Sequence, residues 1–153
     1  RALCYSRTHN GAWAGAVGAT YVSLDELLTA SDIVSLHTAL TDNTRNLLSG
    51  RELALMKPSA ILINTSRGAI VDEEALFAAL KEGRLSGAGL DVFAEEPIGR
   101  SRLLELENVV LTPHTSGLTA ESAHAMAMGA ASSVVAVLRG QMPENAVNAP
   151  GMC

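Results

Sequence analysis

Short apolar runs alternate along the chain with stretches in which apolar residues recur at helical spacing. The short runs are rich in β-branched residues, and several are apolar throughout, which is typical of parallel strands covered by helices on both faces. We predict strands at Ala2–Tyr5, Thr20–Val22, Ile33–Leu36, Ala60–Asn64, Gly87–Val92 and Val109–Leu111. The predicted helices are Leu24–Ala30, Ser49–Met56, Glu73–Glu82 and Ala120–Leu138.

Residues suited to helix ends flank several of these stretches. Ser23 and Asp72 carry side-chain oxygens that can accept a hydrogen bond from a first helical turn. Gly83 and Gly140 stand where two of the helices would stop. Strands separated by helices predict one α/β domain built on a doubly wound parallel sheet. Because ligands of such sheets bind outside the carboxyl ends of the strands, the residues that follow each strand are the candidates for function.

Composition narrows the class of protein. Apolar residues make up 48% of the chain and charged residues 18%, which is a globular profile. The net charge is -5, and the sequence has no cluster of basic residues that could bind a phosphate backbone, so we expect no nucleic-acid partner. No apolar run reaches the roughly 18 residues of a membrane span, so we expect no membrane partner. Cys4 and Cys153 lie at opposite ends without metal-ligand or disulfide spacing, which indicates no metal and a reducing, cytoplasmic environment.

Arg67 follows the apolar run Ala60–Ile63 directly, in the segment Asn64-Thr65-Ser66-Arg67-Gly68. A guanidinium at a strand end offers a planar fork that can hold a carboxylate or a keto acid in two parallel hydrogen bonds. Gly68 would let the chain turn tightly after it. Taken alone, Arg67 has an ordinary alternative, since it could simply pair with a nearby acid.

Two further polar segments follow strands. Asp91 lands near the carboxyl end of the strand in Gly87-Ala88-Gly89-Leu90-Asp91, and Glu96 stands shortly after it, before Pro97. His114 follows the strand Val109–Leu111, and Pro113 stiffens the approach to it. Histidine is the side chain best matched to proton transfer near neutral pH, although a lone loop histidine is usually structural. The three residues together favour a catalytic role over a structural one. Arginine, glutamate and histidine each follow a separate strand, so we expect them to converge on one edge of the sheet.

These segments together resemble a known family. The stretch NTSRGAIVDEEALFAALKEGRLSGAGLDVFAEEP, followed by NVVLTPHTSG, is similar to the signature region of the D-isomer-specific 2-hydroxyacid dehydrogenases. The resemblance runs from about residue 21 to residue 148 and includes SLDELLTASDIVSLHTALTDNTRNLLS. It implies that residues 1–140 are part of an NAD(P)-binding Rossmann domain. The tail 141–153 would then return to a substrate domain that is not among these residues.

The resemblance also implies roles for individual residues. Arg67 of the SRG motif matches the arginine that grips the substrate carboxylate and carbonyl, and His114 of the TPH motif matches the general acid/base. Glu96 matches the acid that pairs with that histidine, and its charge would favour the imidazolium. The positions implied to line the cofactor are His37, Thr38, Thr65, Ser66, Arg67, Asp91, His114 and Gly117. The implied reaction is hydride transfer between a nicotinamide and a small 2-keto/2-hydroxy acid.

The nucleotide-binding signals near the start are unusual. No GxGxxG fingerprint occurs there, and Gly11–Gly15 does not qualify because it comes after the first predicted strand. We therefore expect the first strand and the glycine-rich loop to lie upstream of this chain. At the end of Ala2–Tyr5, where an NAD-preferring member has a carboxylate, stand Ser6 and Arg7, which could bind a 2′-phosphate. We predict a preference for NADP(H), with NAD(H) as the alternative.

Other functions share these motifs. Glu96 disfavours a formate dehydrogenase, which resembles a variant with glutamine there, whereas a phosphite dehydrogenase keeps a similar triad. A non-enzymatic co-repressor or NAD(H) sensor is the alternative from a different class. The Ala120–Leu138 helix, poor in charge, matches a helix near the family's dimer contacts, so we expect a homodimer. We expect no turnover from the isolated chain.

Overall fold

All the strands that the computed structural model describes are parallel, and the description covers residues 1–147. The chain divides into two compact units, residues 1–114 and residues 115–153. The strands of the first unit are β1 (Ala2–Cys4), β2 (Ala19–Tyr21), β3 (Ile33–Leu36), β4 (Ile61–Asn64), β5 (Gly87–Leu90) and β6 (Val109–Leu111). Its helices are α1 (Gly11–Val17), α2 (Leu24–Ala30), α3 (Gly50–Leu55) and α4 (Glu73–Lys81), with 3-10 turns at Gly68–Ile70 and Arg102–Glu105. This alternation confirms the α/β, Rossmann-like fold class.

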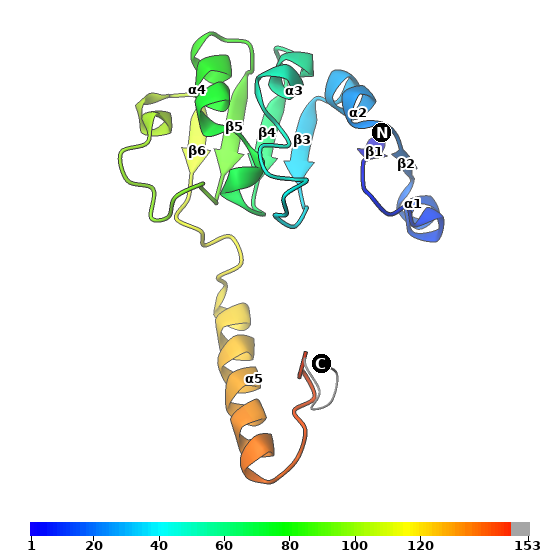
Figure 1. Ribbon diagram of the computed structural model, residues 1–153, viewed down its shortest axis with the longest axis vertical. Coiled ribbons are helices and arrows are strands. Elements are labelled where there is room, and N and C mark those ends of the chain that lie inside the picture. The colour runs from blue at the N-terminus through cyan, green and yellow to red at the C-terminus, as the bar shows by residue number, and fades with distance from the viewer. Residues whose placement is uncertain (148–153) are drawn as a thin grey trace. The chain divides into compact units, whose positions relative to one another are not determined.

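The strands form two sheets, one of β1 and β2 and one in the order β3-β4-β5-β6 (Figure 1). In the larger sheet Leu36 pairs with Asn64, Asn64 with Leu90, and Leu90 with Leu111. These residues are the last of their strands, so all four strands end at one level. The loops that follow them therefore leave the sheet from a common edge.

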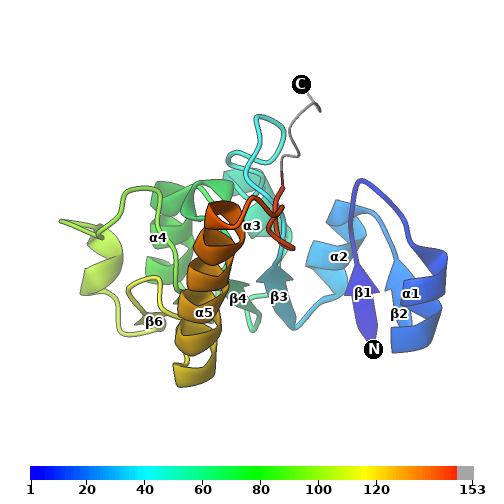
Figure 2. The ribbon, with the colours of Figure 1, turned by 90° about the horizontal axis from the view of Figure 1, so that it is seen from below.

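One face of the larger sheet carries the core. Val34, Leu62 and Leu90 point to that face and are buried, and α3 and α4 lie side by side over it (Figures 1 and 2). On the other face Ile33 is 64% exposed and Val110 is 69% exposed. The apolar run of each strand led us to expect helices on both faces. Over the described residues, α3 and α4 instead cover a single face.

Helix α1 is the element that the sequence pattern did not predict. Asn10 caps it, because its Oδ1 accepts a hydrogen bond from the backbone N–H of Trp13 at 3.0 Å. Gly18 ends it with φ of 66°, a left-handed conformation that suits glycine. Gly11 and Gly15 hid the helix from sequence analysis, since glycine disfavours helix interiors by about 1 kcal/mol.

The other helices agree with prediction to within a residue or so at their ends. Ser23 accepts a hydrogen bond from the Glu26 N–H at 3.2 Å, and Asp72 accepts one from the Ala75 N–H at 3.1 Å. Gly83 follows α4 with φ of 68°. Caps of this kind are local events, and local sequence is enough to predict them.

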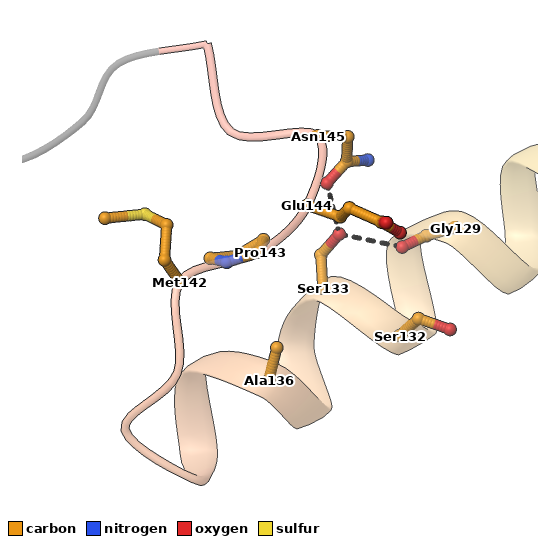
Figure 3. A pocket seen from close by; sticks show the side chains of 8 residues that line it. All are labelled: Gly129, Ser132, Ser133, Ala136, Met142, Pro143, Glu144 and Asn145. Carbon is orange, nitrogen blue, oxygen red and sulfur yellow. Dashed lines mark hydrogen bonds between the residues drawn. The ribbon is translucent and has the colours of Figure 1, made fainter.

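The second unit contains helix α5 (Ala120–Leu138), which agrees with the predicted range. Thr119 caps α5 by accepting the Ser122 N–H at 3.1 Å. Near its end, Ser133 Oγ lies 2.8 Å from both the Gly129 carbonyl oxygen and Asn145 Oδ1 (Figure 3). This contact ties the start of the tail back to the helix. The predicted tail, 141–153, lies outside the described residues from 148 onward.

Candidate active site

Three loops leave the common strand edge where the sequence places its polar residues. Backbone bonds extend the ladder by one step beyond the strands, with the Asp91 N–H donating to the Asn64 carbonyl and the Thr112 N–H donating to the Leu90 carbonyl, both at 3.0 Å. The loops after β4, β5 and β6 are thus fixed to one another where they begin. Arg67, Glu96 and His114 belong to these three loops in turn.

Asn64 shapes the loop after β4. It is 1% exposed, and its Oδ1 accepts the Ser66 N–H at 3.1 Å while its Nδ2 donates to the Arg67 carbonyl at 3.0 Å. An asparagine that satisfies the backbone of a following turn is a common way to fix loop geometry. Asn64 thereby holds Arg67 at the strand edge with its side chain exposed. We gave Asn64 no role from sequence, although a polar residue at the end of an apolar strand was the available signal.

Gly68 lies against the loop after β5. A Cβ atom added to it would overlap the carbonyl group of Phe93 and the backbone nitrogen of Ala94. We predicted a glycine for a tight turn, but the φ of Gly68 does not lie in the left-handed region. Glycine is needed here because a side chain would not fit: only a residue without one lets the Arg67 loop and the Phe93 loop touch.

Asp91 is 3% exposed at the end of β5, and it accepts a hydrogen bond from the Thr112 hydroxyl at 2.5 Å. A buried carboxylate requires partners of this kind because desolvation is costly. Thr112 therefore ties the loop after β6 to the loop after β5 through side chains as well as through the backbone.

Glu96 and His114 form a hydrogen-bonded pair. Glu96 Oε2 lies 2.7 Å from His114 Nδ1, and Glu96 Oε1 accepts the Phe93 N–H at 3.0 Å. The hydrogen bond from His114 holds the pKa of the Glu96 carboxyl below its usual range, and the Phe93 N–H and the charge of Arg67 act in the same direction. The side chains of Glu96 and His114 are 36% and 50% exposed respectively, so the pair is open to a small molecule.

The backbone of His114 is unusual. Its φ is 55°, a left-handed conformation that is rare for residues other than glycine. The His114 N–H donates to the Thr112 carbonyl at 3.0 Å, across Pro113. Strained backbone of this sort costs on the order of 1–3 kcal/mol and gathers at functional sites. The sequence predicted a stiff approach to His114 but not this conformation.

The remaining predicted cofactor residues lie in several places. His37 follows β3, with its Nε2 2.8 Å from Ser35 Oγ, and Thr38 comes next. Thr65 and Ser66 follow β4 on the same edge. The structure thus brings residues after β3, β4, β5 and β6 to one edge.

Three predicted positions are not part of that group. Ser6 and Arg7 are exposed in the loop after β1, which belongs to the smaller sheet. Gly117 belongs to the second unit, where its carbonyl accepts the Ser122 hydroxyl at 2.6 Å.

Within residues 1–147, no group of three or more histidine, cysteine, aspartate or glutamate side chains is arranged to hold a metal ion. Nor does any helix of that range combine the length and the hydrophobicity that a membrane crossing requires.

A parallel sheet with polar loops at the carboxyl ends of its strands defines the class of Rossmann-like nucleotide-binding domains. Comparison with known proteins identifies the family within that class. Residues 1–116 match the family described as D-isomer specific 2-hydroxyacid dehydrogenase, NAD binding domain. The chain belongs to this family, which confirms the resemblance of its motifs.

Similarity to individual proteins supports the same family assignment. The chain is 49% identical over 146 residues to a glyoxylate reductase of Thermococcus litoralis, covering 95% of this chain and 44% of that protein. Its structure is similar to the TT0316 protein of Thermus thermophilus (TM-score 0.89, 43% identity, 97% of this chain and 46% of that one). It is also similar to the apo form of D-lactate dehydrogenase from Escherichia coli (TM-score 0.86, 32% identity, 97% and 46%). The chain therefore spans a little under half the length of these relatives.

Proposed function

We propose that the chain supplies the acid–base and nicotinamide-binding part of an oxidoreductase that interconverts small 2-keto and 2-hydroxy acids of D configuration. The observation that carries this proposal is the 2.7 Å contact between Glu96 and His114 at the strand edge. A histidine held by a carboxylate is suited to move a proton to or from a substrate oxygen. Relatives named glyoxylate reductase and D-lactate dehydrogenase support the substrate class.

The chemistry follows from the atoms of the pair. With His114 Nδ1–H donating to ionised Glu96, Nε2 is left to carry the transferable proton. In the reducing direction His114 gives this proton to the carbonyl oxygen, which becomes the hydroxyl of the product; in the oxidising direction it takes the proton back. A bound nicotinamide supplies or accepts the hydride.

We assign Arg67 to the other end of the substrate. Its guanidinium can hold a carboxylate through two parallel N–H···O bonds and polarise the adjacent carbonyl. Asn64 and Gly68 fix the loop that carries it. Holding the substrate in one orientation is worth several orders of magnitude in rate when the reacting atoms are aligned.

The residues at the edge suit a nicotinamide dinucleotide. The Asp91 carboxylate, together with Thr112, can meet the carboxamide, and Thr38, Thr65 and Ser66 offer polar groups near the ends of β3 and β4. His37 belongs to the same edge, after β3. The assignment of Gly117 to the cofactor rests on the resemblance of its motif alone.

We assign the cofactor preference to Ser6 and Arg7. No carboxylate occurs in the Tyr5-Ser6-Arg7-Thr8 segment after β1 to repel a 2′-phosphate, and both side chains are exposed. This supports NADP(H) over NAD(H).

Turnover by the complete protein, in which this chain is joined to the part that its relatives have in addition, tests the proposal. We expect NAD(P)H-dependent reduction of glyoxylate or hydroxypyruvate. Nucleotide binding without turnover of any 2-keto acid would instead support a co-repressor or sensor, and oxidation of phosphite would support a phosphite dehydrogenase. We expect no turnover from the 153-residue chain alone, and activity there would contradict our placing part of the substrate site elsewhere.

Assembly and location remain predictions. A homodimer is supported by the apolar side chains that α5 leaves exposed, such as Met126 and Val134. A cytoplasmic location is the simplest expectation from the cysteine pattern.

A further inference from the structure

The backbone at Phe93 and Ala94 is held by three contacts. Gly68 packs against its carbonyl group without room for a side chain. The Ala94 N–H donates to Glu73 Oε1 at 2.6 Å. The preceding N–H, that of Phe93, donates to Glu96 Oε1 at 3.0 Å. These two successive peptide groups therefore connect helix α4 and the Arg67 loop to the carboxylate that pairs with the histidine.

We propose that Glu73 is a positioning residue for the Glu96–His114 pair. The segment that carries Glu96 has no regular structure, and its residues 94–97 are exposed. The position of Phe93 N fixes Glu96 Oε1, and hence the Oε2 atom that meets His114. By holding Ala94, Glu73 keeps this short run of chain in place.

Glu73 is suited to this role because it stands on a rigid element. It lies in the first turn of α4, next to the cap residue Asp72. The apolar face of that helix is buried through Leu76, Phe77 and Leu80. A carboxylate that accepts a backbone N–H makes a short, charge-assisted hydrogen bond, roughly twice as strong as a neutral one. Glu73 thus ties the loop to α4 at Ala94, next to Phe93, whose own side chain is buried in the core.

The neighbouring acid, Glu74, provides a contrast within the same turn. Both carboxylates are in the first turn of α4, where negative charge favours a helix N-terminus. Glu74 pairs instead with Arg102 at 3.0 Å and has a side chain that is 73% exposed. Glu74 therefore binds the 3-10 turn Arg102–Glu105, later in the same connection, and not the Ala94 amide, which makes it a control for the carboxylate at the helix end.

The inference rests on the proposed function and predicts a specific kinetic pattern. In the complete protein, Glu73→Ala should lower kcat for a 2-keto acid about tenfold, because a shift of about 1 Å in a supporting segment can cost up to roughly a hundredfold in rate. The Kd for the nicotinamide nucleotide should stay within twofold, since Glu73 binds Ala94, which is not among the assigned cofactor residues. A purely structural role in α4 would not separate these two quantities.

Three further variants sharpen the test. Glu73→Gln keeps an oxygen acceptor at the same reach and should retain most of the wild-type kcat. Glu73→Asp keeps the charge at the helix end, so it preserves the fold, but it is too short to reach Ala94 and should lose activity as Glu73→Ala does. Glu74→Ala should keep the wild-type kcat while changing Tm about as much as Glu73→Ala.

The outcomes separate this inference from the function on which it rests. Equal kcat in Glu73→Ala and Glu74→Ala would overturn the positioning role, and so would a Glu73→Gln variant as slow as Glu73→Ala. If His114→Ala is inactive in the same assay, such a result leaves the proposed function standing. If His114→Ala keeps its turnover, the proposed function itself fails.

Discussion

Both carboxylate oxygens of Glu96 form hydrogen bonds: Oε2 lies 2.7 Å from His114 Nδ1, and Oε1 lies 3.0 Å from the Phe93 nitrogen. One side chain thus fixes the histidine ring to the main chain of a different loop. The ring faces a carboxylate on its Nδ1 side, so Nε2 is the nitrogen that our proposal assigns to the substrate. The loop after β5 therefore helps to set the orientation of the imidazole, although His114 belongs to the loop after β6.

The first prediction concerns His114 itself. In the complete protein, His114→Ala should lower kcat by about 10²–10⁴-fold, because general acid–base catalysis contributes that much. Steady-state kinetics with glyoxylate would measure it. His124→Ala is the matched control, since His124 is an exposed residue of α5 in the second unit. A His114→Ala enzyme with a kcat near wild type would rule out the assigned role.

The second prediction is a pH dependence. Because the folded chain lowers the pKa of Glu96, this carboxylate stays ionised at pH values where an ordinary glutamate becomes protonated. Its contribution to stability is present above the unfolded-state pKa and is lost as the pH falls through the lower folded-state pKa. Carboxyl ¹³C NMR titration of the chain would give the midpoint. In His114→Ala the midpoint should rise, because the largest cause of the shift is the hydrogen bond from His114; equal midpoints would contradict this.

Arg67→Lys tests the guanidinium fork. An ammonium keeps the positive charge but loses the planar pair of donors. We expect KM for the 2-keto acid to rise about tenfold, equivalent to ~1.4 kcal/mol, with a smaller fall in kcat. Arg84→Lys is the control, since Arg84 pairs with Glu82 on the surface, ahead of β5. Unchanged KM in Arg67→Lys would assign Arg67 to loop structure instead.

Sequence patterns predicted the elements along the chain better than the contacts between loops. The strands and most helices are indicated by apolar periodicity and by caps such as Ser23 and Asp72, which are local. Because parallel strands end at one edge, Arg67, Glu96 and His114 could be placed together before any contact was known. Helix α1 was missed because Gly11 and Gly15 weaken its pattern.

The contacts that hold the loops are different in kind. Glu73 and Ala94 are 21 positions apart, and no periodicity links a helix residue to a loop amide. The sequence indicated that glycine matters at position 68, but it suggested a tight turn. The actual reason is the backbone of Phe93, which only the folded chain brings close. The positive φ of His114 likewise has no local sequence signal beyond Pro113. Local rules predict elements, whereas the placement of side chains depends on tertiary contacts.

Cofactor preference can be reversed at Arg7. Arg7→Asp should weaken binding of NADPH more than tenfold and strengthen binding of NADH, because a carboxylate repels the 2′-phosphate and can accept hydrogen bonds from the ribose hydroxyls. The ratio of the two KM values measures this. Arg84→Asp makes the same change of charge before β5 and should leave the ratio unaltered. A wild-type protein that strongly prefers NADH would contradict the premise.

The last prediction concerns the contact of Gly68 with the loop that carries Glu96. In Gly68→Ala the new Cβ would overlap the Phe93 carbonyl, so one loop has to move. Overpacking of this type costs about 1–3 kcal/mol, which corresponds to a Tm lower by ~2–12 °C for a chain of this size. Gly50→Ala is the control, since a Cβ there meets open space at the start of α3, and alanine should hold or raise Tm. Because Gly68 adjoins Arg67 and the loop it touches leads to Glu96, the variant should lose kcat and raise KM together in the complete protein. A Gly68→Ala variant with unchanged Tm and kinetics would show that the two loops are not in contact.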